Sequence, residues 1–139
     1  MEEPRLFTLE EAARLLPAVH EKITSLRQHR NRLQELEQKK AVEELSWLRE
    51  DGTVSPQAQE AIVQLDRLQQ EEAVLFEKDL KALHDTGAEL KDLDEGLVDF
   101  FARRGTELVY LCWKDGEDRI RYWHDLSSGF PGRRPLKEF

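Results

Sequence analysis

The sequence contains a single cysteine, Cys112, among its 139 residues. One cysteine cannot form a disulfide bond within the chain, which excludes the disulfide framework of small secreted proteins. No apolar run approaches the roughly 18 residues that a membrane-spanning helix needs. The first residues, MEEPRLFTLEE, are acidic, whereas a secretory signal begins basic and then becomes apolar. The sequence therefore predicts a cytoplasmic protein without a membrane partner.

Positive charge is scarce as well, because 21 Lys and Arg residues stand against 29 Asp and Glu residues, for a net charge of −8. Residues 1–96 hold 13 basic and 22 acidic side chains, and residues 97–139 hold 8 and 7. Tight binding to a nucleic-acid duplex requires many basic groups that neutralise phosphates. The charge argues against a nucleic-acid partner, while the last third of the chain has enough positive charge to meet one small anion.

Two long segments have the apolar periodicity of helices. In the first, apolar residues recur every seven positions, the pattern of an antiparallel helix pair or coiled coil, as at Ala12, Val19, Leu26 and Leu33. This segment starts at a capping box, TLEE, and we expect it to extend to about Arg49 with a kink at Pro17. The second begins at Pro56 and ends near Gly87. The short connection between them predicts an antiparallel helical hairpin over residues 8–86.

The pattern changes after the second helix. Residues 88–124 contain short stretches with strand-forming side chains, which predict a small antiparallel β-sheet. The clearest part is a β-hairpin over residues 106–124 with a tight turn at Asp-Gly. Residues 125–139 are rich in glycine, serine and proline and are expected to form a closing loop tail. The predicted fold class is α+β, in a single domain of residues 1–139.

The position of this turn sets a strand register. Centring the hairpin on the Asp-Gly pair places Glu107 opposite His124 and Leu111 opposite Ile120. In this register Cys112 and His124 lie on opposite faces of the sheet, because side chains alternate along a strand. We therefore interpret Cys112 as a small hydrophobic residue and not as a nucleophile, which needs a base within hydrogen-bond distance.

Three stretches of the sequence carry a family resemblance: FTLEEAARLLPAV, GAELKDLDEGLVDFF and LVYLCWKDGEDRIRYWHDLSSGFPGRRPL. They resemble the prokaryotic domain-of-unknown-function family 2203, and the resemblance covers nearly the whole chain. The family carries no agreed activity. The resemblance therefore implies a small bacterial-type cytoplasmic protein and no particular catalytic residue.

Histidines and carboxylates form the first candidate site. An antiparallel hairpin brings His20 close to the level of His84, and His124 lies at the start of the tail with Asp99 within reach. Imidazole and carboxylate groups suit a divalent transition metal, and a metal-dependent hydrolase is one activity that such ligands support. The alternative is structural: His84 caps a helix C-terminus, His20 lies on the surface, and His124 pairs with Glu107.

The tail SSGFPGRRP forms the second candidate site. Its glycines permit exposed backbone N–H groups, and an arginine can bind a carboxylate or phosphate with two parallel hydrogen bonds. These features predict a small-anion or nucleotide site, or a polar docking surface made by His124, Arg133, Arg134, Glu117 and Asp99. In the alternative, Phe130 anchors the tail and the arginines pair with the acidic helices.

Three functions thus remain open from the sequence. The favoured hypothesis is a non-enzymatic interaction or scaffold protein that forms a homodimer through its helical hairpin and docks an unknown protein partner, since long helical arms favour a partner helix. The second is a metal-binding protein, with a divalent transition metal as cofactor. The third is the binding of a small anion or nucleotide by the tail.

Overall fold

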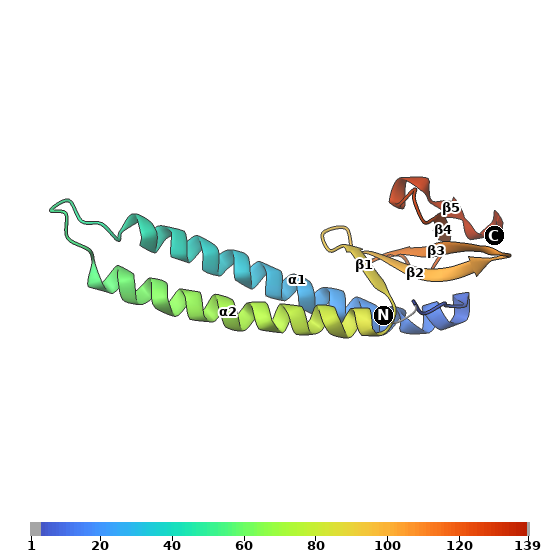
Figure 1. Cartoon of the computed structure of the whole chain (residues 1–139), viewed down its shortest axis with the longest axis horizontal. Coiled ribbons are helices and arrows are strands. Elements are labelled where there is room, and N and C mark those ends of the chain that lie inside the picture. The colour runs from blue at the N-terminus through green and yellow to red at the C-terminus, as the bar shows by residue number, and fades with distance from the viewer. Residues whose placement is uncertain (1–3, 139) are drawn as a thin grey trace. The chain divides into compact units, whose positions relative to one another are not determined.

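The computed structural model of the protein describes residues 4–138 (Figure 1). Two long helices, α1 (Leu9–Leu45) and α2 (Pro56–Asp85), precede one sheet of five antiparallel strands. The strands are β1 (Glu89–Asp92), β2 (Leu97–Arg104), β3 (Glu107–Lys114), β4 (Tyr122–Asp125) and β5 (Arg134–Pro135), with the short 3-10 helices η1 (Phe130–Gly132) and η2 (Leu136–Glu138) in the tail. The predicted α+β class, with a helical hairpin before an antiparallel sheet, is confirmed. Within the described residues, no helix is long and apolar enough to cross a membrane.

Local hydrogen bonds fix where the helices begin. The backbone N–H of Thr8 donates to Glu11 Oε1 at 3.0 Å, and the N–H of Glu11 donates to Thr8 Oγ1 at 3.1 Å, which is the predicted capping box. The Ser55 hydroxyl accepts from the N–H of Ala58 at 3.2 Å and caps α2 in the same way. The first helix is continuous through Pro17 and ends slightly before the predicted position.

The chain divides into two compact units. The hairpin unit is Leu26–Asp79 and contains the greater part of both helices. The sheet unit consists of Met1–Ser25 and Leu80–Phe139 and contains all five strands. The prediction that residues 1–139 form a single domain stays a prediction.

Polar contacts link the two helical segments of the hairpin unit. His29 Nδ1 lies 2.6 Å from Glu72 Oε1, and Lys40 Nζ lies 2.9 Å from Asp66 Oδ1. Fully buried apolar side chains are few in this unit, namely Leu26, Leu36 and Ala58. Two helices alone cannot enclose a broad apolar stripe, so most of the unit's leucines and valines keep partial exposure.

The sheet unit has a dense apolar core on one face of its sheet. The register aligns the inward side chains of β2 with those of β3, including Val98, Phe100, Leu111 and Trp113, all of which are buried. The segment before α1 covers this face, because the Phe7 ring meets the Phe100 ring edge-on at 5.3 Å. The N–H of Phe7 also donates to the carbonyl of Phe101 at 2.7 Å, which anchors the start of the chain to β2.

The predicted register of β3 and β4 is wrong. The turn forms, since the N–H of Glu117 donates to the Lys114 carbonyl at 3.0 Å, but β4 does not begin until Tyr122. The intervening residues are retained by their own contacts: Trp113 Nε1 donates to the Glu117 carbonyl at 3.0 Å, and Ile120 is buried. As a result, Tyr110 and not Glu107 stands opposite His124, a shift of three residues. An odd shift moves every side chain of the strand to the other face of the sheet.

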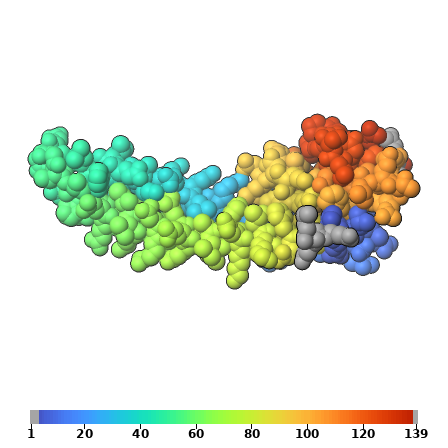
Figure 2. Space-filling view, viewed as in Figure 1, coloured from blue at the N-terminus to red at the C-terminus, as the bar shows by residue number. Residues whose placement is uncertain are grey.

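The tail adds a fifth strand, where the sequence predicted only a loop. β5 pairs with β4 through two residues, one of them Pro135, and at the other edge β1 has an irregular register between Leu90 and Asp92. The space-filling view shows the tail (red) packed against the neighbouring strands (orange) (Figure 2). The Arg133 guanidinium lies 4.0 Å above the Tyr122 ring, on the sheet face opposite the apolar core. This second face, partly covered by the tail, carries the candidate site.

Candidate metal centre

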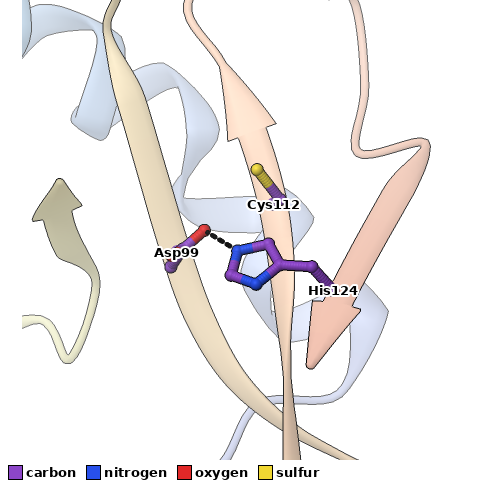
Figure 3. A group of neighbouring side chains, drawn as sticks. All are labelled: Asp99, Cys112 and His124. Carbon is purple, nitrogen blue, oxygen red and sulfur yellow. Dashed lines mark hydrogen bonds and ion pairs between the residues drawn. The ribbon is translucent and has the colours of Figure 1, made fainter. Parts of the chain in front are cut away.

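Three neighbouring strands each contribute one side chain to a compact cluster: Asp99 from β2, Cys112 from β3 and His124 from β4 (Figure 3). A carboxylate oxygen, the Sγ atom and a ring nitrogen of these residues all lie within 4.8 Å of one another. The three residues are 4%, 1% and 2% exposed. Elsewhere among residues 4–138, no three His, Cys, Asp or Glu side chains gather their ligand atoms so closely.

The strand register explains why these residues meet. Asp99 stands opposite Cys112, and Tyr110, two residues before Cys112, stands opposite His124. Residues separated by two along a strand share a face, so the three side chains project to the same side. The Tyr110 ring lies beside the cluster, with its centroid 5.4 Å from that of the His124 ring.

The hydrogen bonds of His124 assign its tautomer. Nδ1 lies 2.6 Å from the carbonyl oxygen of Asp125, which can only accept, so Nδ1 carries a proton. Nε2 lies 3.0 Å from Asp99 Oδ1. That contact holds one further proton, either on the imidazole as part of an ion pair or on the carboxyl as part of a neutral pair. Nε2 is therefore the ring nitrogen that a metal ion would bind, in exchange for this proton.

Burial favours the protonated forms of the other two groups. It raises the pKa of the Asp99 carboxyl above its ordinary value, and His124 opposes this effect only in part. Burial, together with the neighbouring Asp99 carboxylate, raises the pKa of the Cys112 thiol to about 12. Cys112 is thus a neutral thiol at physiological pH and not an activated nucleophile.

The cluster lines a small pocket of about 190 Å³. The remaining lining residues come from β1, β2, β3 and the tail: Lys91, Leu97, Tyr110, Leu126, Ser127, Gly129 and Phe130. Lys91 Nζ lies 4.7 Å from the centroid of the Tyr110 ring and 3.2 Å from Glu89 Oε2. The pocket therefore has a polar wall, which includes the Lys91 ammonium group, and an apolar wall formed by leucines and a phenylalanine.

The four residues of the predicted metal set are not all in one place. The structure brings Asp99 and His124 together, but neither His20 nor His84 belongs to the cluster. The exposed His20 Nδ1 lies 2.7 Å from Asp115 Oδ1. His84, in the last turn of α2, accepts a hydrogen bond from the backbone N–H of Leu90 at 3.2 Å.

The alternative pairing of His124 with Glu107 is wrong, because the shifted register places Tyr110 opposite His124 and Asp99 binds its ring.

The predicted docking surface is divided in the same way. Arg133 Nη2 lies 2.6 Å from Glu117 Oε1 and 3.3 Å from the Cys112 carbonyl, so the guanidinium binds a carboxylate of the loop between β3 and β4 and not one of the acidic helices. Arg134 is exposed and stacks on Trp123 at 5.2 Å. Asp99 and His124 are buried, which leaves Arg134 as the most exposed member of the predicted set.

Cys112 is the site residue that the sequence interpretation missed. Its exclusion depended on the two-residue hairpin, which left Cys112 and His124 on opposite faces. A signal against that hairpin was present in EDRIR, residues 117–121, where charged side chains occupy most positions of the supposed strand. Asp118 and Arg121 bind each other at 2.9 Å, a contact that belongs to a loop.

Comparison with known proteins gives a family and no relative of known activity. The family model described as "Uncharacterized conserved protein (DUF2203)" matches residues 5–136, nearly the whole chain. No curated protein and no solved structure matches the chain.

Proposed function

Since the chain belongs to the family DUF2203, whose description names no activity, the function has to come from the site, and we propose that the protein binds a divalent transition-metal ion through Asp99, Cys112 and His124. The observation that carries the proposal is the convergence of one oxygen, one sulfur and one nitrogen atom within 4.8 Å, from three different strands. Zinc is the favoured ion, because thiolate, imidazole and carboxylate are its usual protein ligands.

Charge balance supports this proposal. With the carboxyl and thiol deprotonated, the ligands carry two negative charges, which a divalent cation neutralises in a site that is almost fully buried. Without a metal, protons occupy the same places: one on Cys112 and one between Asp99 and His124. Binding is therefore expected to release about two protons per metal ion at neutral pH, since metal ligands must be deprotonated.

The surroundings of His124 also suit a ligand. Metal-binding histidines usually donate their second ring N–H to a carboxylate or backbone carbonyl, which orients the ring. In this protein the Asp125 carbonyl fills that role at 2.6 Å from Nδ1. The three ligands lie on paired strands and not on loops, so little ordering should accompany binding.

The test is a titration with Co²⁺, which reports thiolate ligation through an absorption band that Zn²⁺ lacks. The wild type should bind one ion per chain with a thiolate-to-cobalt band. Cys112→Ser should lose the band, and His124→Ala should weaken binding by at least the roughly 10- to 100-fold that altered metal surroundings cause. His20→Ala and His84→Ala are matched controls that should leave binding unchanged. A wild type without the band, or a band that survives Cys112→Ser, would contradict the proposal.

A reduced thiol suits the cytoplasm, where disulfide bonds are rare, so the predicted cytoplasmic location forms part of the proposal. The metal-dependent hydrolase activity that the sequence suggests stays a prediction. A cobalt-loaded protein that hydrolyses model phosphate or carboxyl esters faster than Cys112→Ser would support it.

The favoured hypothesis of the sequence, self-association through the helical hairpin, remains a second candidate. Eight of the thirteen large apolar side chains that are exposed in the described residues lie in the hairpin unit: Val42, Leu45, Trp47, Leu48, Val63, Leu68, Val74 and Leu75. A second copy of the same unit would cover such side chains in a four-helix arrangement with two-fold symmetry. The unit has 8 basic and 12 acidic residues, so a second copy offers charges of both signs to pair with.

Sedimentation equilibrium tests this candidate directly. Leu45→Glu and Val63→Glu should convert a dimer to a monomer, while Leu108→Glu, an exposed leucine of the sheet unit, should not. A wild type that is monomeric at high concentration would exclude a homodimer. The unknown protein partner predicted from the sequence would then be the remaining occupant of this surface.

A further inference from the structure

The cluster supplies three ligands and no fourth. The other residues that line the pocket are Lys91, Leu97, Tyr110, Leu126, Ser127, Gly129 and Phe130, and none of them is a histidine, cysteine or acid. Structural zinc sites normally have four protein ligands, whereas sites with three keep one position for water or an exogenous ligand. Because all three ligands line the pocket, the remaining coordination position of a bound ion would be open to it.

The size of the pocket limits what can enter. Its volume is about 190 Å³. This volume is below the range of drug-sized ligand pockets, which begin at roughly 300 Å³. The part of a ligand that lies inside the pocket is therefore small, comparable with a carboxylic acid of three or four carbon atoms.

The charge of the pocket wall selects an anion. Burial pulls the pKa of Lys91 down, but Glu89 and Tyr110 outweigh it and hold that pKa above its ordinary value, so the ammonium group stays charged. The ammonium lies over the Tyr110 ring, which itself packs beside the His124 ring. Glu89 already pairs with this ammonium at 3.2 Å, so an entering anionic oxygen donor would share the ammonium with Glu89 while it takes the open position of the metal ion.

The apolar wall selects the rest of the molecule. Leu97, Leu126 and Phe130 line the pocket, and the last two are 48% and 39% exposed, so ligand binding can bury their surface. A phosphate or sulfate ion would leave this wall without a contact. Arginine, the residue that favours planar recognition of phosphate, does not line the pocket.

We infer that the pocket binds a short-chain monocarboxylate, whose carboxylate takes the open position of the metal ion beside Lys91 and whose alkyl chain lies against Leu97, Leu126 and Phe130. This inference rests on the proposed metal site. It adds the class of small molecule that the metal site would bind.

The experiment follows the visible absorption of the cobalt-loaded full chain during titration with acetate, butyrate, phosphate and propylamine. Butyrate should change the spectrum with saturation and bind about tenfold more tightly than acetate, the factor expected for two additional buried methylene groups. Phosphate should bind more weakly than butyrate, and propylamine should have no effect.

Single substitutions separate the contributions of the polar wall and the apolar wall to ligand binding. Lys91→Gln should weaken butyrate and acetate alike, by roughly tenfold for the loss of a charged hydrogen bond, while the thiolate-to-cobalt band stays present. Leu126→Ala should reduce the preference for butyrate over acetate. Lys81→Gln, which removes an exposed lysine of α2 that pairs with Asp85, is the matched control for charge and should change nothing.

The possible failures can be told apart. Absence of the thiolate-to-cobalt band would refute the metal site itself. A normal band with no response to any anion would show a closed site and overturn this inference alone. Phosphate binding as tightly as butyrate, or butyrate binding that is unaffected by Lys91→Gln, would also overturn it while leaving the metal site intact.

Discussion

The sheet unit and the hairpin unit differ in how they are stabilised. The sheet unit buries large side chains such as Phe100, Leu111 and Trp113 in one continuous layer, and it also buries the polar residues Asp99 and His124. The hairpin unit fully buries only three apolar side chains, Leu26, Leu36 and Ala58, and has polar contacts across its helices. Burying an ionisable group costs free energy unless the group is paired. Buried ionisable groups are therefore concentrated at functional sites. The contrast agrees with the two proposals above, a metal site in the sheet unit and self-association through the hairpin unit.

The largest expected difference between the two units is in thiol reactivity. At pH 8 a thiol with a pKa of about 12 has a thiolate fraction about a thousandfold lower than one with the ordinary value of 9.0. In a Ser46→Cys variant, the new thiol of the exposed hairpin turn should react rapidly with iodoacetamide, and Cys112 of the same metal-free molecule should react at least a thousandfold more slowly.

The pH profile sharpens this result. The rate at Cys112 should rise about tenfold per pH unit from pH 7 to pH 10, because each step deprotonates more thiol, whereas the rate at residue 46 should rise more slowly above pH 9.0, the ordinary pKa of a thiol. Mass spectrometry of digested samples measures both rates. Equal rates at the two thiols would mean that the sheet unit opens readily, which would remove the contrast.

The second difference is in core packing. Phe100→Ala removes a fully buried ring and should lower the free energy of unfolding by about 3–5 kcal/mol. Val63→Ala, at a position that is 67% exposed, should change it by less than about 0.5 kcal/mol. Urea denaturation followed by circular dichroism measures both. A large effect at Val63 would instead indicate that this side chain is covered in solution, as in a dimer.

A smaller difference is expected for ion pairs. Arg133→Ala leaves the partly buried Glu117 without its partner and should cost about 1.5–3 kcal/mol, the range for hydrogen bonds to charged groups. Lys40→Ala breaks the corresponding pair with Asp66 in the hairpin unit and should cost less, because solvent screens that pair. Thermal unfolding of the two variants, at low and high salt, compares them. If the stability lost in Arg133→Ala depended strongly on salt concentration, the Arg133–Glu117 pair would be more exposed in solution than in the structure.

The smallest effect is expected for Asp99→Asn in the absence of metal. Burial raises the pKa of Asp99 in the folded state, so its carboxyl favours folding below the ordinary value of 3.8 and loses this contribution as the pH rises through the raised value. The variant removes that loss, and its amide can donate to His124 Nε2. Above the raised pKa, the stability of the variant should match or exceed that of the wild type by roughly 1 kcal/mol or less. Chemical denaturation at pH 4 and pH 8 tests the sign, and a variant that is destabilised only at pH 8 would contradict it.

Local signals made the helices predictable from the sequence, and the lack of such signals explains the main error in the sheet. The capping box at Thr8, the cap at Ser55 and the buried repeat through Val19 and Leu26 follow from residues adjacent in sequence. The register of β4 does not, because the segment before this strand also contacts distant residues: the Glu117 carboxylate binds Arg133, sixteen positions later.

The same difference between local and distant information explains why the sequence predicts only part of the candidate site. The sequence predicts Asp99 and His124 as ligands because it displays their chemistry directly. It does not predict Cys112, because the position of Cys112 relative to His124 depends on strand register, and register depends on contacts between distant residues. An error of three residues was enough to separate two side chains that in fact share one face.

The edges of the sheet restrict how this protein can associate with others. β1 is short, with an irregular register, and β5 pairs through only two residues, one of which is a proline without a backbone donor. A sheet bounded in this way offers an incoming strand few aligned backbone groups, which protects it from edge-to-edge aggregation. The strands are therefore protected from polymerisation, even though the helices expose apolar side chains that the proposed self-association would cover.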